Sequence, residues 1–325
     1  MLVFWTTRHN RHPLIAGLAA SFGSRFERAS LLLHYEDWLP QDERSWARLP
    51  QARHVFTDIE FLAGAAAQRA AALHRFLAAR GPVLNHPLLT LKRLELHRRL
   101  YAEGINRFRS VPLEQLATEP LRYPVFLRQA DDHRGSQTGL LHDEAQLRRE
   151  LEQLEQRSQP LQGWIATEFC DSVDAQGLRH KYGAFIIAGR IVPRHLFFSR
   201  EWVIKEAGEL APELLERERR YLDENPHRTQ LLRIFELAGV DYGRIDYSVV
   251  DGKIQVWEIN TNPMIFRPSH WHGPRAIQHR QVCARIEAAW SETGALEAAS
   301  KWRRPGQWSV YRRMGSTWLR EMGRR

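Results

Sequence analysis

Residues 239–263 read GVDYGRIDYSVVDGKIQVWEINTNP and restrict the possible folds of this chain more than any other segment. Two runs of β-branched and aromatic residues flank Asp251-Gly252, a dipeptide typical of tight hairpin turns, so the segment predicts two antiparallel strands. Asp246 lies in the first strand, and Glu258 and Asn260 end the second, although strands disfavour Asp and Asn. These residues indicate a functional site at a strand end. The competing interpretation is that they are solvated residues at a sheet edge.

Two carboxylates and an amide oxygen form an all-oxygen donor set, which suits Mg²⁺ held jointly with nucleotide phosphates and does not suit zinc. Glu258 and Asn260 are two residues apart and share a face of their strand. A regular two-residue turn would place Asp246 opposite Trp257, so the two carboxylates would face opposite sides of the sheet. A shared metal therefore requires an odd number of loop residues or a bulge. We predict the three-residue loop Val250–Gly252, with its glycine in the left-handed conformation.

Strand and helix signals alternate over residues 1–85, which predicts a small α/β layer. Apolar periodicity predicts further elements downstream, and Asp143-x-x-Gln146 is a capping-box pattern at the start of a helix. The expected strands are 2–6, 55–59, 83–85, 123–129, 164–169 and the hairpins 182–192 and 245–260; the expected helices are 14–22, 61–80, 88–103, 229–238, 278–299 and one from 143. We divide the chain into an α/β domain (1–87), a central region (88–275) and a C-terminal helix with its tail (276–325).

The charge of the 325-residue chain is concentrated at one end. Residues 299–325 contain eight Lys or Arg residues and one Glu, so they carry +7 of the net charge of +9. The body is nearly balanced, and its charge does not indicate a nucleic-acid partner. The tail holds Trp302, Trp308 and Trp318 among its arginines, a combination that can bind RNA or an anionic membrane. We favour a terminal helix that packs these tryptophans on the body.

The sequence disfavours a membrane-spanning protein and a secreted protein held by disulfides. No apolar run approaches the roughly 18 residues of a membrane span. Cys170 and Cys283 are the only cysteines, too few for a disulfide framework or a cysteine zinc site. The N-terminal residues lack the features of a signal peptide, and we expect a cytoplasmic protein.

The segment from Asp246 to Pro263, together with several upstream segments, resembles the ATP-grasp superfamily, which includes D-alanine–D-alanine ligases, glutathione synthetases and ribosomal-protein glutamate ligases. Asp246 followed by Glu258–Pro263 is similar to the metal-binding end of that fold. The similarity spans about residues 1–265 and includes five upstream segments: Asn85-His86-Pro87 with Lys92, the strand 123–128, the loop 132–136, the hinge 167–169 and the hairpin 182–190. The resemblance implies an α/β (α+β) ATP-grasp fold, with an N-terminal Rossmann-like domain and two lobes that clasp a nucleotide.

The resemblance also implies a reaction. A substrate carboxylate attacks the γ-phosphate of ATP to give an acylphosphate, and an amine then displaces phosphate. The substrates would be small molecules or peptides that carry the carboxylate and the amine, and a homodimer would be a common assembly. The implied roles are metal binding (Mg²⁺ or Mn²⁺) by Asp246, Glu258 and Asn260; phosphate contacts by Lys92, Arg128, Gly135 and Ser136; adenine contacts by Glu168 and Phe169; ribose contact by Asp171 or Asp174; and substrate or catalytic contacts by Lys181, Arg194 and Lys205.

Three departures from the family pattern leave alternatives open. Arg128 stands where lysine is usual, and its planar fork would change the phosphate geometry. The phosphate loop has only Gly135 and Gly139, and Gly183 stands where arginine is common, with Lys181 or Arg179 as replacements. A small-molecule kinase and a catalytically altered nucleotide-binding scaffold therefore compete with the ligase. Arg190 and His195 are weaker substrate candidates, and we interpret His133, His142, His270 and His272 as not binding metal.

Overall fold

The computed structural model describes residues 1–11, 13, 25–132, 135–157, 161–205, 208–265 and 273–296. Several sequence predictions lie outside these ranges: the helix at 14–22, His133, the pair His270 and His272, and the tryptophan-bearing tail. In the described ranges, no helix is both long enough and apolar enough to cross a membrane.

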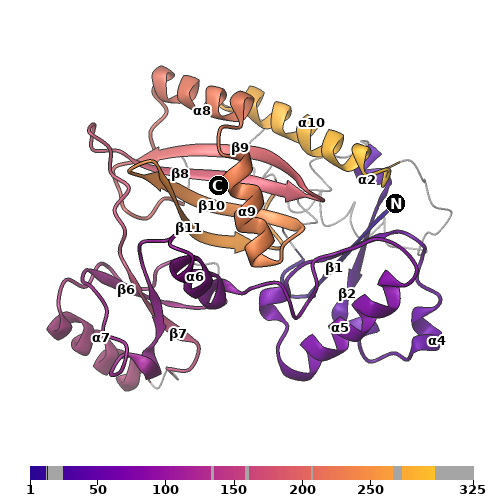
Figure 1. Cartoon of the computed structure of the whole chain (residues 1–325), viewed down its shortest axis with the longest axis horizontal. Coiled ribbons are helices and arrows are strands. Elements are labelled where there is room, and N and C mark those ends of the chain that lie inside the picture. Colours follow the sequence, from indigo (N-terminus) through magenta and orange to yellow (C-terminus); the bar gives the residue numbers. More distant parts are fainter. Residues whose placement is uncertain are drawn as a thin grey trace, which may run out of the picture.

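The N-terminal part of the chain forms a parallel four-stranded sheet in the order β2-β1-β3-β4. Figure 1 shows its strands β1 and β2 and the helices α4 and α5. Strand β1 is buried along its whole length, as expected for a parallel sheet with both faces covered. The strands are β1 Leu2–Thr6, β2 Ser30–His34, β3 Arg53–Phe56 and β4 Val83–Leu84; the helical segments are α2 Arg25–Arg28, α3 Tyr35–Trp38, α4 Glu43–Trp46, η1 Ile59–Phe61 and α5 Gly64–Ala78. The α/β layer predicted for this part of the chain is confirmed.

A smaller antiparallel sheet, in the order β5-β7-β6, follows helix α6. Helix α7 packs Leu147 and Leu154 on this sheet, and Asp143 accepts a hydrogen bond from the Gln146 backbone at 2.8 Å, so the predicted helix start is confirmed. The elements are α6 Arg93–Ala102, β5 Ser110–Pro112, η2 Leu113–Gln115, β6 Val125–Gln129, α7 Glu144–Gln156 and β7 Trp164–Glu168.

The third sheet is antiparallel, in the order β11-β10-β8-β9. Helix α9 packs Leu231, Ile234 and Phe235 in a buried cluster with one face of this sheet. On the other face, Phe185, Ile187 and Tyr242 are buried in a cluster with α10. The elements are β8 Arg179–Ile187, β9 Arg190–Ser199, α8 Pro212–Glu224, α9 Arg228–Ala238, β10 Tyr242–Val250, β11 Lys253–Asn260 and α10 Ala276–Glu292. The sequence did not predict α8.

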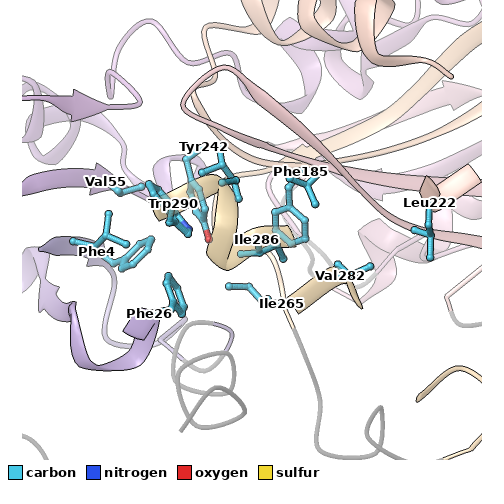
Figure 2. Close-up of a cluster of buried hydrophobic side chains, with 14 of the residues drawn as sticks. Phe4, Phe26, Val55, Phe185, Leu222, Tyr242, Ile265, Val282, Ile286 and Trp290 are labelled. Atoms are coloured by element: carbon cyan, nitrogen blue, oxygen red, sulfur yellow. The ribbon is translucent and has the colours of Figure 1, made fainter. Parts of the chain in front are cut away.

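Helix α10 joins the first and third sheets through one aromatic cluster (Figure 2). The ring of Trp290 lies 5.9 Å from Phe4 on β1 and 5.5 Å from Tyr242 on β10, measured between centroids. Asn85 adds a polar link, because its side chain donates to the carbonyls of Phe56 and Tyr242 at 2.9 and 2.7 Å. These buried contacts fix the N-terminal sheet against the strand that carries Asp246.

The β10–β11 hairpin corrects one prediction. Val250 pairs with Lys253, so the loop has two residues, and both Asp251 and Gly252 have positive φ. The three-residue loop is therefore wrong. A bulge between Asp246 and Tyr247 inserts Trp257 as the extra residue of β11 instead, and Asp246 pairs with Glu258. The bulge supplies the odd count that facing carboxylates require.

Candidate functional site

A cavity of about 680 Å³ lies between the small sheet and the large sheet. One end is aromatic: Trp202 contacts Phe126 and Phe169, and Phe108 stacks on Trp257 with ring centroids 5.1 Å apart. The other end is charged, and its lining cations are Arg128, Arg179, Lys181, Lys205 and Arg244 beside the carboxylates Asp246 and Glu258. A ligand with an aromatic part and several negative charges fits this division.

A row of four residues crosses the large sheet at the charged end. Glu258 pairs with Asp246, Asp246 pairs with Gly183, and Gly183 pairs with His195. Residues paired across strands share a face, so these residues lie on one side of the sheet. The sequence predicted the shared face of Asp246 and Glu258 as a condition of the metal site, and the bulge meets that condition.

Asp246 is 3% exposed and is held by two cations. Arg244 donates through Nε to Oδ1 at 2.7 Å and through its terminal nitrogen to Oδ2 at 3.2 Å, while the Lys181 ammonium lies 3.3 Å from Oδ2. Arg244 was not predicted from the sequence. Its position two residues before Asp246, on the same strand face, was the available signal.

Glu258 receives a hydrogen bond from Arg93, and the guanidinium of Arg128 lies 3.9 Å from the same oxygen. Burial and the neighbouring Arg93 lower the pKa of Arg128 to about 10. Two guanidiniums converge on one carboxylate here, so the charged end retains positive charge and favours an anionic ligand.

The structure does not bring Lys92 to the cavity. Its ammonium donates to the carbonyls of Glu60 and Leu62 at 3.0 and 2.9 Å, next to the N-terminal domain. Arg93, the next residue, reaches Glu258 instead and is the cation that the sequence did not identify. The two residues separate because Lys92 is the N-cap of α6, whereas Arg93 begins the helix.

Glu168 is also turned away from the cavity wall. Its neighbours Thr167 and Phe169 line the cavity, and the Glu168 carboxylate binds Arg109 and Arg122 on the opposite side, at 2.7 and 2.8 Å. Phe169 thus lines the cavity, while the Glu168 carboxylate holds Arg109 and Arg122 together. The predicted ribose contacts Asp171 and Asp174 are not lining residues of the cavity, but each pairs with one that is: Asp171 with Arg179 and Asp174 with His180.

The arginine pair around Glu168 predicts an acid-sensitive hinge. Burial raises the pKa of Glu168, but the hydrogen bonds from Arg122 and Arg109 outweigh it and lower the pKa from 4.5 to about 2. The interaction stabilises the fold fully above pH 4.5 and is lost as the pH falls toward 2. Solvent screens Arg122, so we expect Glu168→Gln to lower the free energy of unfolding at pH 7 by about 2 kcal/mol, measured by urea denaturation.

The same measurement at pH 3.5 should show a smaller difference between Glu168→Gln and wild type than at pH 7. Glu144→Gln, which removes an exposed i,i+4 pair with Arg148, is the control and should cost less than about 0.5 kcal/mol. An equal loss at both pH values would contradict the depressed pKa.

The remaining predicted residues divide into two groups. Gly135, Ser136, Lys181 and Lys205 line the cavity, and a Cβ on Gly135 would lie 3.5 Å from Lys205 Cε, so the phosphate loop and Lys205 are adjacent. Arg194 is 5% exposed and donates to the carbonyl of Ile265, away from the described cavity wall. Burial, Arg275 and Arg244 lower the pKa of Arg194 to about 9.

The donor set fits a hard divalent cation. Asp246 and Glu258 face each other, and Asn260 shares the face of Glu258, with its side-chain oxygen accepting from the Asn262 backbone at 2.7 Å. All donors are oxygens, which suits Mg²⁺ and Mn²⁺. The described ranges contain no cluster of three or more His, Cys, Asp or Glu residues that could hold a metal, so the protein donors at this position would be the two carboxylates and the amide oxygen of Asn260.

Comparison with known proteins identifies the fold. No protein-family model and no curated protein matches the sequence. Among solved structures, the VanG D-Ala:D-Ser ligase from Enterococcus faecalis has a TM-score of 0.50 at 12% identity, covering 89% of this chain and 98% of the other. The three sheets and this similarity define the class: the chain has the ATP-grasp fold.

Two further solved structures are similar to this chain over most of its length. A D-alanine–D-alanine ligase from Bacillus anthracis, complexed with ATP, has a TM-score of 0.47 at 14% identity and covers 88% of this chain and 97% of its own. The ATP-grasp ligase PsnB, complexed with a minimal precursor, has a TM-score of 0.49 at 14% identity and covers 87% and 99%.

Proposed function

We propose that this protein is an ATP-dependent ligase that joins a carboxylate to an amine through an acylphosphate. The observation that carries the proposal is the cavity with an aromatic end and a cationic end, in which Asp246 and Glu258 face each other at the bulge of β11. The volume of about 680 Å³ lies within the range of small-molecule sites. The ATP-grasp fold supports the same class of reaction by analogy.

In this proposal the purine lies between the aromatic side chains, and the phosphates extend along β6 toward the cations. Phe126 and Arg128 are two residues apart on β6 and both line the cavity, so they would contact the two ends of one nucleotide. Lys205, next to Gly135, would cover the phosphates from the opposite side.

Asp246, Glu258 and Asn260 would hold the metal against the phosphates. A bound Mg²⁺ would offset the negative charge that develops on the phosphates, and Mn²⁺ would suit the same oxygen donors. Arg244 and Lys181 are fixed by Asp246 and would orient the attacking carboxylate and neutralise the charge that develops as it reacts. Both cations are held in fixed positions by Asp246, which favours positioning as their contribution.

The substrates would be a small-molecule or peptide carboxylate and an amine. Two free thiols, Cys170 and Cys283, and a demand for ATP fit a cytoplasmic location. We retain the boundaries 1–87, 88–275 and 276–325 as a proposal, because residues 88–275 contain all the lining residues of the cavity.

The decisive experiment measures thermal unfolding with and without ATP and Mg²⁺, for wild type and for Glu258→Gln. A ligand that binds only the folded state raises its stability by RT ln(1 + [L]/Kd), which is about 2.7 kcal/mol at 100 times Kd. We expect a magnesium-dependent rise of several degrees for wild type and most of that rise to be absent in Glu258→Gln, because the variant loses one metal ligand.

The control is Glu152→Gln, which changes an exposed residue of α7 and should respond like wild type. If wild type shows no change at millimolar ATP with Mg²⁺, the proposed function is wrong. If it responds, ADP release in the presence of pooled carboxylates and amines should then yield an amide and phosphate. A phosphorylated product without amide would identify a kinase instead.

A further inference from the structure

A chain of buried polar side chains leads from helix α6 to the aromatic end of the cavity. His97, Ser110 and Thr167 are each 2% exposed, and they belong to α6, β5 and β7. His97 Nε2 lies 2.9 Å from the carbonyl oxygen of Trp257, and His97 Nδ1 lies 2.7 Å from Ser110 Oγ. Ser110 Oγ lies 2.8 Å from Thr167 Oγ1, and Thr167 and His97 line the cavity.

The bond between His97 and the Trp257 carbonyl determines the direction of the other hydrogen bonds in this series of side chains. A carbonyl oxygen only accepts, so His97 Nε2 carries the hydrogen that points to Trp257. Burial is the main cause that lowers the pKa of His97 to about 3, so the imidazole is neutral near pH 7 and its Nδ1 has no hydrogen. Ser110 must therefore donate to Nδ1, and Thr167 must donate to Ser110.

The consequence at the cavity wall is a hydroxyl that can only accept. Its one hydrogen is directed at Ser110, so the lone pairs of Thr167 Oγ1 remain for a ligand. Thr167 pairs with Phe126 across β6 and β7, and Phe126 contacts Trp202, so this oxygen lies beside the aromatic end.

We infer that Thr167, held by Ser110 and His97, selects a purine nucleotide with an amino group at position 6 and disfavours one with a 6-oxo group. This inference rests on the proposed function, in which the base occupies the aromatic end. An adenine amino group donates to the Thr167 oxygen, whereas the oxygen of a 6-oxopurine faces another acceptor. Thr167 is the specificity residue, and Ser110 and His97 are positioning residues that act through it.

The test compares the dissociation constants of ATP, inosine triphosphate and purine riboside triphosphate, which differ in the group at position 6 and, for inosine triphosphate, in the hydrogen on N1. Calorimetry with Mg²⁺ and without acceptor substrates measures binding and needs no turnover. For wild type we expect ATP to bind about tenfold to a hundredfold more tightly than inosine triphosphate, because a buried acceptor opposite an acceptor loses a hydrogen bond. Purine riboside triphosphate should fall between them.

Two variants separate the relay from a general effect on folding. In Ser110→Ala the Thr167 hydroxyl loses its fixed acceptor and can turn its hydrogen toward the ligand, so the preference for ATP over inosine triphosphate should fall to within about threefold. In Thr167→Val the wall oxygen is absent, so ATP should bind less tightly and the preference should disappear. Thr118→Val, at an exposed site, is the control and should keep the wild-type ratio.

Thermal unfolding without nucleotide establishes that each variant is folded. If ATP and inosine triphosphate bind wild type equally well, the inference is overturned while nucleotide binding stands. An unchanged preference in folded Ser110→Ala overturns it too, because the relay would then not control Thr167. If no nucleotide binds wild type, the proposed function fails and the inference fails with it.

Discussion

Replacing Gly183 with alanine is expected to destabilise the protein by about 3 kcal/mol, although the change adds one methyl group. A Cβ on Gly183 would lie 2.6 Å from Nε2 of His195 and 2.8 Å from its Nδ1. The imidazole has little room to move, because it is 4% exposed and stacks on Phe197 with centroids 4.1 Å apart. The strain is therefore steric and local, and it does not arise from backbone conformation.

A double-mutant cycle with His195→Ala measures this contact directly. In the His195→Ala background the ring is absent, so adding Gly183→Ala should cost less than about 1 kcal/mol. Gly139→Ala is the matched control, since a Cβ there meets no atom within 4 Å. Urea unfolding gives the four free energies. Additive effects of the two substitutions would show that the ring and the glycine are independent.

The same contact explains a departure from the family pattern. The resemblance led us to expect an arginine at position 183, with Lys181 or Arg179 as its replacement. The structure fills that space with the His195 ring, and Lys181 binds Asp246 while Arg179 binds Asp171. An arginine at 183 would bring its Cβ into the His195 ring, so it is incompatible with this position of the ring. The cations that pair with Asp246 in the row are Lys181 and Arg244.

Local patterns predicted the parts of the fold that depend on neighbours in sequence. The Asp-Gly hairpin, the buried strand 2–6 and the capped helix from Asp143 follow from turn chemistry, apolar runs and capping, and all three are confirmed. The facing of Asp246 and Glu258 followed from a requirement, namely that both reach one metal. The three-residue loop predicted to bring them together was wrong, because a bulge satisfies the same requirement as an odd loop and the structure has the bulge.

The bulge could not be located from the sequence because distant residues hold it. The carbonyl of Trp257 accepts from His97, and its indole donates to Ser248 at 2.9 Å. Arg93 was missed for the same reason, since it meets Glu258 across 165 residues. Lys92 and Glu168 match the expected motif positions in sequence. In the structure, however, Lys92 donates to backbone carbonyls and Glu168 binds two arginines. Sequence spacing fixes a strand face, but it does not decide which of two neighbouring cations reaches the site.

Removing Glu218 is expected to have the largest effect on stability, about 3–5 kcal/mol for Glu218→Ala. The carboxylate is 1% exposed and accepts from Arg275 Nε at 2.7 Å, from a second Arg275 nitrogen and from the Leu196 backbone at 3.2 Å. Without it, the Arg275 guanidinium stays buried over the ring of Phe197 and beside Arg194, with no compensating charge from α8.

The cost should come from the uncompensated charge and not from lost packing, and a second variant distinguishes the two. Glu218→Leu with Arg275→Met removes both charges and keeps the volume, so its free energy of unfolding should lie within about 1 kcal/mol of wild type. Urea unfolding of wild type, Glu218→Ala, Arg275→Ala and the double variant gives the comparison. If the double variant is as unstable as Glu218→Ala, the ion pair itself holds α8 and the start of α10 against β9. The explanation by the uncompensated charge of Arg275 would then be wrong. If it is stable and still responds to ATP with Mg²⁺, the pair serves only to hold these elements behind the cavity, and the site depends on the charges that face the nucleotide.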